Sequence, residues 1–215
     1  ISFGSSLLHN YLINKKVPLA DNIFLGPEPG KSLIKNFSKK IKTTKFSNLD
    51  QLANKVSDLI YKNKIIGVCN GNMEFGPRAL GNRSIIFSSK NKDKIDEVNI
   101  RLGRNEFMPF APVLIDTNAK KLFKNLGSHD VNLNFMTTCY NCKEYMINKF
   151  PAVVHVDKTA RPQIISKSHP NKLYYRILKI LEKKYDILCI VNTSFNTHDE
   201  PIVCFADHAI NNLLK

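Results

Sequence analysis

The sequence lacks several features that define common protein classes. No apolar run approaches ~18 residues, the length a transmembrane helix needs. The first residues show no basic region followed by an apolar stretch, so we expect no signal peptide. The five cysteines are an odd number without a disulfide-like spacing, which fits a reducing environment. We therefore expect a cytoplasmic protein that does not contact a membrane.

Motifs of several large enzyme classes are also absent. The sequence has no Walker A motif, no GxGxxG dinucleotide motif and no GxSxG hydrolase motif, which disfavours P-loop, Rossmann and serine-hydrolase interpretations. Cys139 and Cys142 form one CxxC pair, but the chain has neither a second CxxC nor an HxxxH. Because a structural zinc ion needs four ligands, we expect no metal site here. Whether these two cysteines bind anything is left open.

The chain has enough apolar residues for one domain with a core, since 43% of its 215 residues are hydrophobic. Segments with helical spacing alternate with short apolar runs typical of strands. Helices are predicted at Ile1–Val17, Ser47–Lys62, Asp93–Leu102, Thr117–Leu126, Cys142–Lys149, Asn171–Tyr185 and Asp207–Leu214. Strands are predicted at Lys64–Cys69, Ser84–Phe87, Phe110–Ile115, Ala152–Val156, Gln163–Ile165 and Ile187–Asn192. This pattern favours an α/β or α+β fold with a mixed sheet and flanking helices.

The remaining segments are less regular. Pro18–Gly30 is punctuated by proline and glycine and is interpreted as a linker. Lys31–Lys45 is expected to form a short helix and a solvated strand, and Asn132–Cys139 is an ambiguous segment, with a strand as one option. Pro109 and Pro112 introduce the third predicted strand, which we therefore place at a sheet edge or at a bulge.

The formal net charge is +14, with 32 basic and 18 acidic residues. Such a charge is typical of proteins that bind nucleic acid, a membrane surface or phosphorylated ligands. The alternative is a general lysine and asparagine bias on solvated helix faces. The arginines stand apart from the lysines because they concentrate near glycine and proline.

The stretch NGNMEFGPRALGNRS (Asn70–Ser84) joins two predicted strands and is rich in glycine and arginine. Glycines such as Gly76 allow a backbone to approach a ligand closely, and arginines offer planar donors to phosphate or carboxylate. Pro77 stiffens the loop before Arg78, which we interpret as a ligand contact. Arg83 is either a second ligand contact or a structural ion pair, with Glu74 as its partner. Glu74 is expected to order the loop by accepting hydrogen bonds from it.

Two later segments also contain candidate functional side chains. His155 and Asp157 alternate at strand spacing, so they would share a face, either as a base with its orienting carboxylate or as a structural pair. The cluster Asn192–Asn196 (NTSFN) ends a buried strand, a common ligand location in α/β sheets. Its amides and hydroxyl can hydrogen-bond the polar groups of a ligand, such as a base or a ribose. An Asx or ST turn that stabilises its own backbone is the alternative.

The Asn70–Ser84 stretch and three further motifs resemble, in the same order, the C-terminal domain of NodU/CmcH-type O-carbamoyltransferases. The three are NEFMPFAP (Asn105–Pro112), HVDKTARPQ (His155–Gln163) and NTSFNTHDEPIVC (Asn192–Cys204). This resemblance implies a YrdC-like fold, a twisted open mixed sheet, for residues 31–215. It also implies that residues 1–30 are the tail and linker of a preceding Kae1-like domain that lies outside this sequence.

The resemblance implies an activity for the whole enzyme. ATP and carbamoyl phosphate would form a carbamoyl-adenylate in this domain, and the N-terminal domain, with its metal, would transfer the carbamoyl group to a hydroxyl acceptor. Mg²⁺ would accompany ATP, held mostly by substrate phosphates. An RNA-binding module without carbamoylation activity is the alternative. The acceptor and the oligomeric state are not specified by the sequence.

The site residues follow from the matching motifs. Of Arg101 and Arg104, either of which also suits a helix C-terminus, we choose Arg104 for the family's arginine before the aromatic-proline motif. The residues expected to act on the reacting groups are Arg78, Arg104 and Arg161. The residues expected to bind substrate or nucleotide are Gly76, Arg83, His155, Gln163, Asn192, Ser194 and Asn196.

Overall fold

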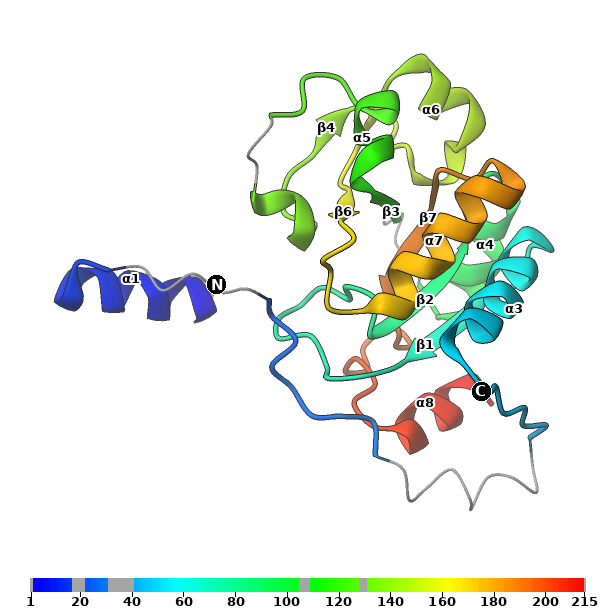
Figure 1. The fold of residues 1–215 in the computed structure, drawn as a ribbon, viewed down its shortest axis with the longest axis horizontal. Helices are drawn as coiled ribbons and strands as arrows, with labels where there is room; N and C mark the ends of the chain where they lie inside the picture. Colours follow the sequence, from blue (N-terminus) through cyan, green and yellow to red (C-terminus); the bar gives the residue numbers. More distant parts are fainter. Residues whose placement is uncertain (1, 17–21, 31–40, 105–108, 128–130, 215) are drawn as a thin grey trace.

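A five-stranded mixed sheet forms the centre of the computed structural model, which describes residues 2–16, 22–30, 41–104, 109–127 and 131–214 (Figure 1). The strand order is β1-β2-β7-β3-β6. Neighbouring strands are antiparallel except for β3 and β6, which are parallel. The strands are β1 (Ile66–Cys69), β2 (Arg83–Ser88), β3 (Ala111–Ile115), β6 (Gln163–Ile165) and β7 (Cys189–Ser194). The expected mixed sheet with flanking helices is confirmed.

Two long helices, α3 (Leu49–Tyr61) and α7 (Lys172–Tyr185), pack against each other and against the sheet (Figure 1). Each starts at an asparagine whose side chain accepts from a backbone N–H of the first turn: Asn48 from Gln51, and Asn171 from Tyr174. Such caps satisfy donors that a helix leaves unpaired. The helix predictions for Ser47–Lys62 and Asn171–Tyr185 are thus confirmed.

Shorter elements complete the described chain. They are α4 (Asp93–Arg101), α5 (Asp116–Leu122), α6 (Glu144–Lys149), α8 (Ala206–Leu213), the 3-10 turns η1 (Val131–Phe135) and η2 (Pro151–Val153), and the small antiparallel pair β4 (Tyr140–Asn141) and β5 (Thr159–Ala160). Helix α1 (Ser2–Asn14) stands apart from the sheet in Figure 1, and its Leu8, Leu12 and Ile13 are exposed.

The core lies between the sheet and the helices that cover it. Strands β3 and β7 are its centre, with Val113, Leu114, Ile190 and Val191 fully buried. Because an inner strand of a mixed sheet is covered on both faces, its sequence is a continuous apolar run and not an alternating one.

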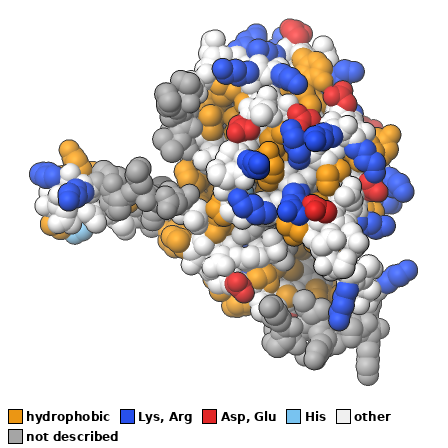
Figure 2. Space-filling model, in the orientation of Figure 1, with side chains coloured by type: hydrophobic (Ala, Val, Ile, Leu, Met, Phe, Trp, Pro, Cys, Tyr) orange, Lys and Arg blue, Asp and Glu red, His pale blue; other side chains and the backbone are white. Residues whose placement is uncertain are grey.

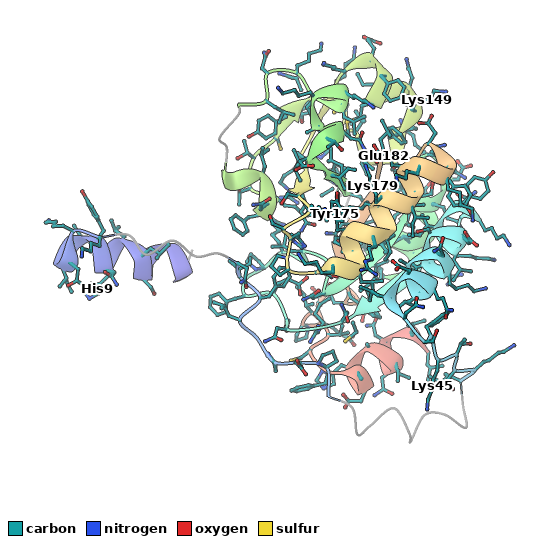
Figure 3. All side chains as sticks on the ribbon, in the orientation of Figure 1. His9, Lys45, Lys149, Tyr175, Lys179 and Glu182 are labelled. Atoms are coloured by element: carbon teal, nitrogen blue, oxygen red, sulfur yellow. The ribbon has the colours of Figure 1, made fainter. Side chains whose placement is uncertain are left out.

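The outer surface is strongly charged. Figure 2 shows lysine and arginine side chains spread over much of the visible face, with fewer acidic side chains among them. On α7, Lys179 and Glu182 lie one turn apart, and Lys179 Nζ is 2.6 Å from Glu182 Oε2 (Figure 3). Among the described helices, none has the length and apolar character needed to cross a membrane.

Two sequence-based predictions were wrong. Residues 152–156 do not form a strand: Pro151 opens η2, and the chain then turns so that His155 N donates to Thr159 O at 2.8 Å. Strand β3 is not at the sheet edge, because β7 and β6 flank it. Pro112 is tolerated because pairing with β6 begins only at the next residue, Val113.

Some predictions fall on residues that the structure does not describe. The expected helix and strand in Lys31–Lys45 lie mostly there, as do residues 105–108 of the NEFMPFAP motif. The ambiguous segment Asn132–Cys139 contains most of η1 and no strand within its described length.

Candidate functional site

The loop between β1 and β2 is held from inside by Glu74. This carboxylate is 4% exposed, and its Oε1 accepts the backbone N–H groups of Leu80, Asn82 and Arg83 at 2.6, 2.8 and 3.1 Å. A carboxylate that accepts several N–H groups fixes the loop more firmly than neutral acceptors would. The prediction that Glu74 orders the loop is confirmed.

Arg83 is completely buried and bonds only to main-chain carbonyls in the described structure. Its Nε donates to Cys204 O, its Nη2 to Pro27 O, and its Nη1 to the carbonyls of Asn70, Gly71 and Asn82, all within 2.8–3.1 Å. No nitrogen of the guanidinium is left for a ligand. The expected ligand contact of Arg83 is therefore wrong. Its role is structural, as the alternative expected, but it acts through main-chain carbonyls, since no ion pair between Arg83 and Glu74 is found among the described residues.

The linker also runs along this loop. Gly26 N donates to Met73 O, Met73 N to Pro27 O, and Phe75 N to Ile23 O, at 2.7–3.0 Å. We call this ensemble of linker, loop interior and Arg83 the anchored side of the loop. Gly81 completes it: its φ is +115°, and a Cβ there would stand 2.5 Å from the ring of Tyr174. Only glycine fits that position without strain.

The opposite side of the loop borders a small hollow that gathers five of the predicted site residues. Its volume is about 80 Å³. The lining comes from the loop, from the residues around the start of β3, and from the end of β7. We call it the arginine hollow, and its lining is Pro77, Arg78, Ala79, Arg104, Pro109, Phe110, Ala111, Met136, Arg161, Asn192, Thr193 and Ser194.

Arg104 is fixed by two contacts within the hollow. Its Nη2 donates to Thr193 Oγ1 at 3.1 Å, and its guanidinium carbon lies 5.4 Å from the centre of the Phe110 ring. Partial burial lowers the pKa of Arg104, although an arginine stays protonated at neutral pH. Thr193 and Phe110 were not among the predicted site residues, but both belong to motifs already noticed in the sequence.

Arg78 and Arg161 place two more positive charges at the hollow. Burial lowers the pKa of Arg161, and the positive charge of nearby Arg78 lowers it further. Among the described residues, no carboxylate forms an ion pair with Arg78, Arg104 or Arg161. Three cations without an acidic partner make this hollow suited to an anion.

A chain of hydrogen-bonded amides links Asn192, which lines the hollow, to Gln163. Gln163 Nε2 donates to Leu80 O at 2.9 Å, and Asn192 Nδ2 donates to Gln163 Oε1 at 2.8 Å and to Ala79 O at 3.1 Å. Gln163 is fully buried and is not part of the lining of the hollow.

The remaining predicted residues lie outside the hollow. Gly76 is exposed on the loop with a φ of +126°. Asn196 Nδ2 donates to the carbonyls of Thr197 and Glu200, as the turn alternative expected.

His155 and Asp157 lie on a turn, where Thr159 Oγ1 donates to Asp157 at 2.7 Å and lies 3.1 Å from His155 Nδ1. Burial lowers the pKa of His155.

A larger pocket of about 840 Å³ adjoins the arginine hollow and shares Pro109 and Phe110 with it. We call it the Phe110 pocket. Ile95, Ile147 and Val154 contribute apolar surface, while His155 and residues of α4 contribute polar groups. Together the two cavities offer a small cationic compartment beside a roomier, mixed one.

Metal-binding groups do not gather in the described structure. No set of three or more His, Cys, Asp or Glu side chains there is close enough to hold a metal ion, and the arginine hollow contains no carboxylate. The residues present therefore do not fit a metal held by the protein at this site. Cys142 is buried, and burial raises its thiol pKa to about 12.

The fold and the site together define a mixed α/β domain with a cationic hollow beside its sheet, and comparison with solved structures supports this class. Full-length HypF, solved in a phosphate- and nucleotide-bound form, superposes with a TM-score of 0.55 at 14% sequence identity. HypF from T. kodakarensis superposes with a TM-score of 0.52 at 18% identity. Each comparison covers 80% of this chain and 20% of the HypF chain. At these identities the likeness concerns the fold.

The chain belongs to the carbamoyltransferase family, because the family profile described as "Carbamoyltransferase C-terminus" matches residues 57–215. The nodulation protein NolO of Bradyrhizobium diazoefficiens is 36% identical over 166 residues, 77% of this chain and 30% of NolO. Nodulation protein U of Sinorhizobium fredii is 34% identical, over 66% of this chain and 25% of that protein. An uncharacterized protein of Methanocaldococcus jannaschii is 41% identical, over 74% and 30%. The matched segment thus spans less than a third of these relatives.

Proposed function

We propose that this domain binds ATP and carbamoyl phosphate and joins them into a carbamoyl-adenylate. The observation that carries the proposal is the arginine hollow, where Arg78, Arg104 and Arg161 converge without an acidic partner among the described residues. Membership of the carbamoyltransferase family supports carbamoyl chemistry. The phosphate- and nucleotide-bound state of HypF, which shares the fold, supports both ligand classes.

The balanced conversion consumes carbamoyl phosphate, ATP and water, and releases phosphate, pyrophosphate and the carbamoyl-adenylate. Water replaces the phosphate of carbamoyl phosphate to give carbamate. A carbamate oxygen then bonds to the α-phosphorus of ATP while the bond to pyrophosphate breaks. Such chemistry depends on positioning and on neutralising phosphate charge, and needs no nucleophilic side chain. The three guanidiniums would supply that neutralisation.

The two cavities suggest how the substrates divide the space. The hollow has room for a phosphate-sized group and not for a nucleoside, whereas the adjoining Phe110 pocket is about ten times larger in volume. We place carbamoyl phosphate in the hollow and ATP in the Phe110 pocket. Mg²⁺ would arrive bound to the ATP phosphates, because the described residues offer it no carboxylate cluster.

Transfer of the carbamoyl group to a hydroxyl acceptor is part of the same proposal. The relatives are more than three times longer than the segment they share with this chain. The acceptor and the transfer step would belong to that additional length, with a preceding Kae1-like domain and its metal as partners. The domain described here would deliver the activated carbamoyl group.

The test combines calorimetry with exchange. ATP and carbamoyl phosphate would be titrated into the 215-residue protein, and ATP–pyrophosphate exchange would be measured with carbamoyl phosphate present. Arg161→Ala removes a guanidinium of the hollow, and Arg176→Ala removes one from α7, where it pairs with Asp50 at 2.7 Å. We expect Arg161→Ala to weaken binding and exchange, and Arg176→Ala to leave both unchanged.

Each outcome has a clear meaning. Binding with exchange would support adenylate formation by this domain alone, and binding without exchange would limit it to substrate binding. RNA binding in place of ATP binding, falling steeply with salt and weakened equally by both variants, would favour the nucleic-acid alternative. That result would overturn the proposed function.

A further inference from the structure

The ends of helices α3 and α7 are joined by a pair of stacked tyrosine rings. Figure 1 shows the two helices packed along each other and running in the same direction, so both end at one corner of the domain. There the rings of Tyr61 and Tyr185 lie 4.1 Å apart, centre to centre, with 12° between their planes. Tyr61 remains 53% exposed, so part of its ring is open to a further stacking partner.

Polar contacts hold this stack in place. Tyr185 Oη donates to Asp58 Oδ1 at 2.5 Å, and Lys184 Nζ donates to the same oxygen at 3.0 Å. Lys184 Nζ also lies 5.0 Å from the centre of the Tyr185 ring, and Lys90 Nζ donates to Tyr185 O at 3.4 Å. Because Tyr185 is fixed from several sides, it supports the Tyr61 ring before a ligand arrives, which lowers the cost of binding.

Lysines surround the stack. Residues 58–64, residues 183–186 and Lys90 are far apart in the sequence, and the contacts of Tyr185 bring them together. Their exposed lysines are Lys62, Lys64, Lys90, Lys183 and Lys184, and their acidic residues are Asp58 and Asp186. Asp58 is already engaged by Tyr185 and Lys184. We call this cluster the tyrosine platform, and its excess of positive charge attracts an anionic partner.

The aromatic ring narrows the choice of partner. Free phosphate or an acidic peptide would supply negative charge, but neither has a flat group to stack on Tyr61. A double-stranded nucleic acid keeps its bases stacked on one another and out of reach of such a ring. A single strand offers both features, because its bases can stack on aromatic side chains while its phosphates lie beside lysines.

We infer that the tyrosine platform binds single-stranded nucleic acid, with a base stacked on Tyr61 and the neighbouring phosphates beside the surrounding lysines. Such binding tolerates different sequences, because every base has a flat face, and it weakens with salt. The platform shares no residue with the lining of the arginine hollow or of the Phe110 pocket. Binding here would therefore accompany ATP binding and not replace it.

The experiment measures binding of a fluorescent oligouridylate of about 12 nucleotides to the 215-residue protein by fluorescence anisotropy. Tyr61→Ala should weaken binding roughly tenfold, the effect of losing one stacked base. Tyr61→Phe keeps a flat ring and should bind as the unchanged protein does. Tyr11→Ala is the matched control, since Tyr11 is 45% exposed on α1 with Lys15 Nζ 5.8 Å from its ring centre. We expect it to bind normally.

The lysines are tested through the salt dependence of the same titration. Lys62→Gln removes one phosphate contact, so the slope of log affinity against log salt should become shallower by about 0.7. Lys45→Gln is the control: Lys45 is exposed and precedes the start of α3, at the other end of this helix from the platform (Figure 3). It should leave the slope unchanged. Equal slopes for Lys62→Gln and the unchanged protein would contradict the phosphate contact.

Several results would overturn the inference. Normal binding by Tyr61→Ala, or an equal loss in Tyr11→Ala, would remove the role of Tyr61. A loss in Arg161→Ala as large as that in Tyr61→Ala would place the strand at the arginine hollow. Displacement by polyglutamate as effective as by unlabelled oligouridylate would assign the surface to acidic peptides. If Tyr61→Ala does not fold, the unchanged protein still decides, because a duplex of the same length that binds as tightly would exclude stacking on Tyr61.

Discussion

Arg78 and Arg83 belong to one loop and lie five residues apart, yet the structure gives them opposite surroundings. Arg83 is on the anchored side, fully buried, with every guanidinium nitrogen bonded to a main-chain carbonyl. Arg78 is exposed and lines the arginine hollow, where its positive charge acts on Arg161. The same side chain holds the fold where each of its nitrogens bonds to the backbone, and it lies exposed at the hollow where no such bonds are made in the described structure.

The largest expected effect is on the anchored side. Arg83→Met would remove five hydrogen bonds and leave the carbonyls of several segments unpaired in the interior. We expect the free energy of unfolding to fall by more than about 3 kcal/mol, measured by urea denaturation. Arg176→Met at the surface pair with Asp50 is the matched control, with a change below about 1 kcal/mol. Equal losses in the two variants would contradict the anchoring role.

The second largest expected effect concerns the arginine hollow. Arg78→Ala should weaken binding of carbamoyl phosphate roughly 30-fold, since a charge-assisted contact is worth about 2 kcal/mol. Its free energy of unfolding should stay within about 0.5 kcal/mol of the original, because Arg78 is exposed. Calorimetry and urea denaturation on the same samples would check both. A variant that is destabilised and binds normally would reverse the contrast with Arg83.

His169 makes the anchored side sensitive to acid. It lies edge-on to Phe24 of the linker, with ring centres 5.6 Å apart, and burial lowers its pKa to about 4. Between pH 7 and pH 5 the unfolded chain takes up a proton at this residue, with an ordinary pKa near 6.5, and the folded protein does not. Stability should therefore fall by about 2 kcal/mol as the pH is lowered over this range.

His169→Asn isolates this contribution. Asparagine can still accept the bond that Asn171 N makes to His169 Nδ1 at 3.3 Å, but it does not titrate. Urea denaturation at both pH values should show a smaller loss of stability in the variant. The same pH dependence in both proteins would show that His169 is not the group responsible.

The smallest expected effect is that of removing the hydrogen bond that Arg104 makes to Thr193. Thr193→Val would remove the hydroxyl that accepts from Arg104 Nη2 while retaining its shape. We expect roughly fivefold weaker binding of carbamoyl phosphate, or about 1 kcal/mol. Thr193→Ser, which keeps the hydroxyl, should bind normally in the same calorimetric titration. Weak binding by the serine variant too would point to packing and not to the hydrogen bond.

Much of the fold follows from local patterns in the sequence. The apolar faces and asparagine caps of α3 and α7 lie within single segments, so spacing alone predicts them. The prediction of a strand at residues 152–156 was wrong, because the chain there begins with a 3-10 turn in which Ala152 N donates to Ser89 O. Pro112 led to the wrong prediction that β3 lies at a sheet edge. The order of the strands depends on pairing between distant segments, so the residues of one strand do not determine it.

The site shows the same division. Motifs brought Arg78, Arg104, Arg161, Asn192 and Ser194 to attention, and the structure gathers them at one hollow. The structural role of Arg83 could not be predicted from the sequence. Its hydrogen-bond acceptors are the carbonyls of residues 27, 70, 71, 82 and 204, and no local sequence pattern connects these residues. The orientation of Asn192 likewise depends on Gln163 and Ala79, which are distant in sequence.

The family profile begins further along the chain than the hydrogen bonds that hold this domain together. The family profile begins at residue 57, but Ile23, Gly26 and Pro27 pair with the loop, and Pro27 O receives Arg83. An expression fragment cut at residue 57 would contain every matched residue and still lack part of the scaffold that shapes the loop. The hydrogen-bonded unit is therefore longer than the segment that the family profile matches, and fragments for biochemistry should start before Asn22.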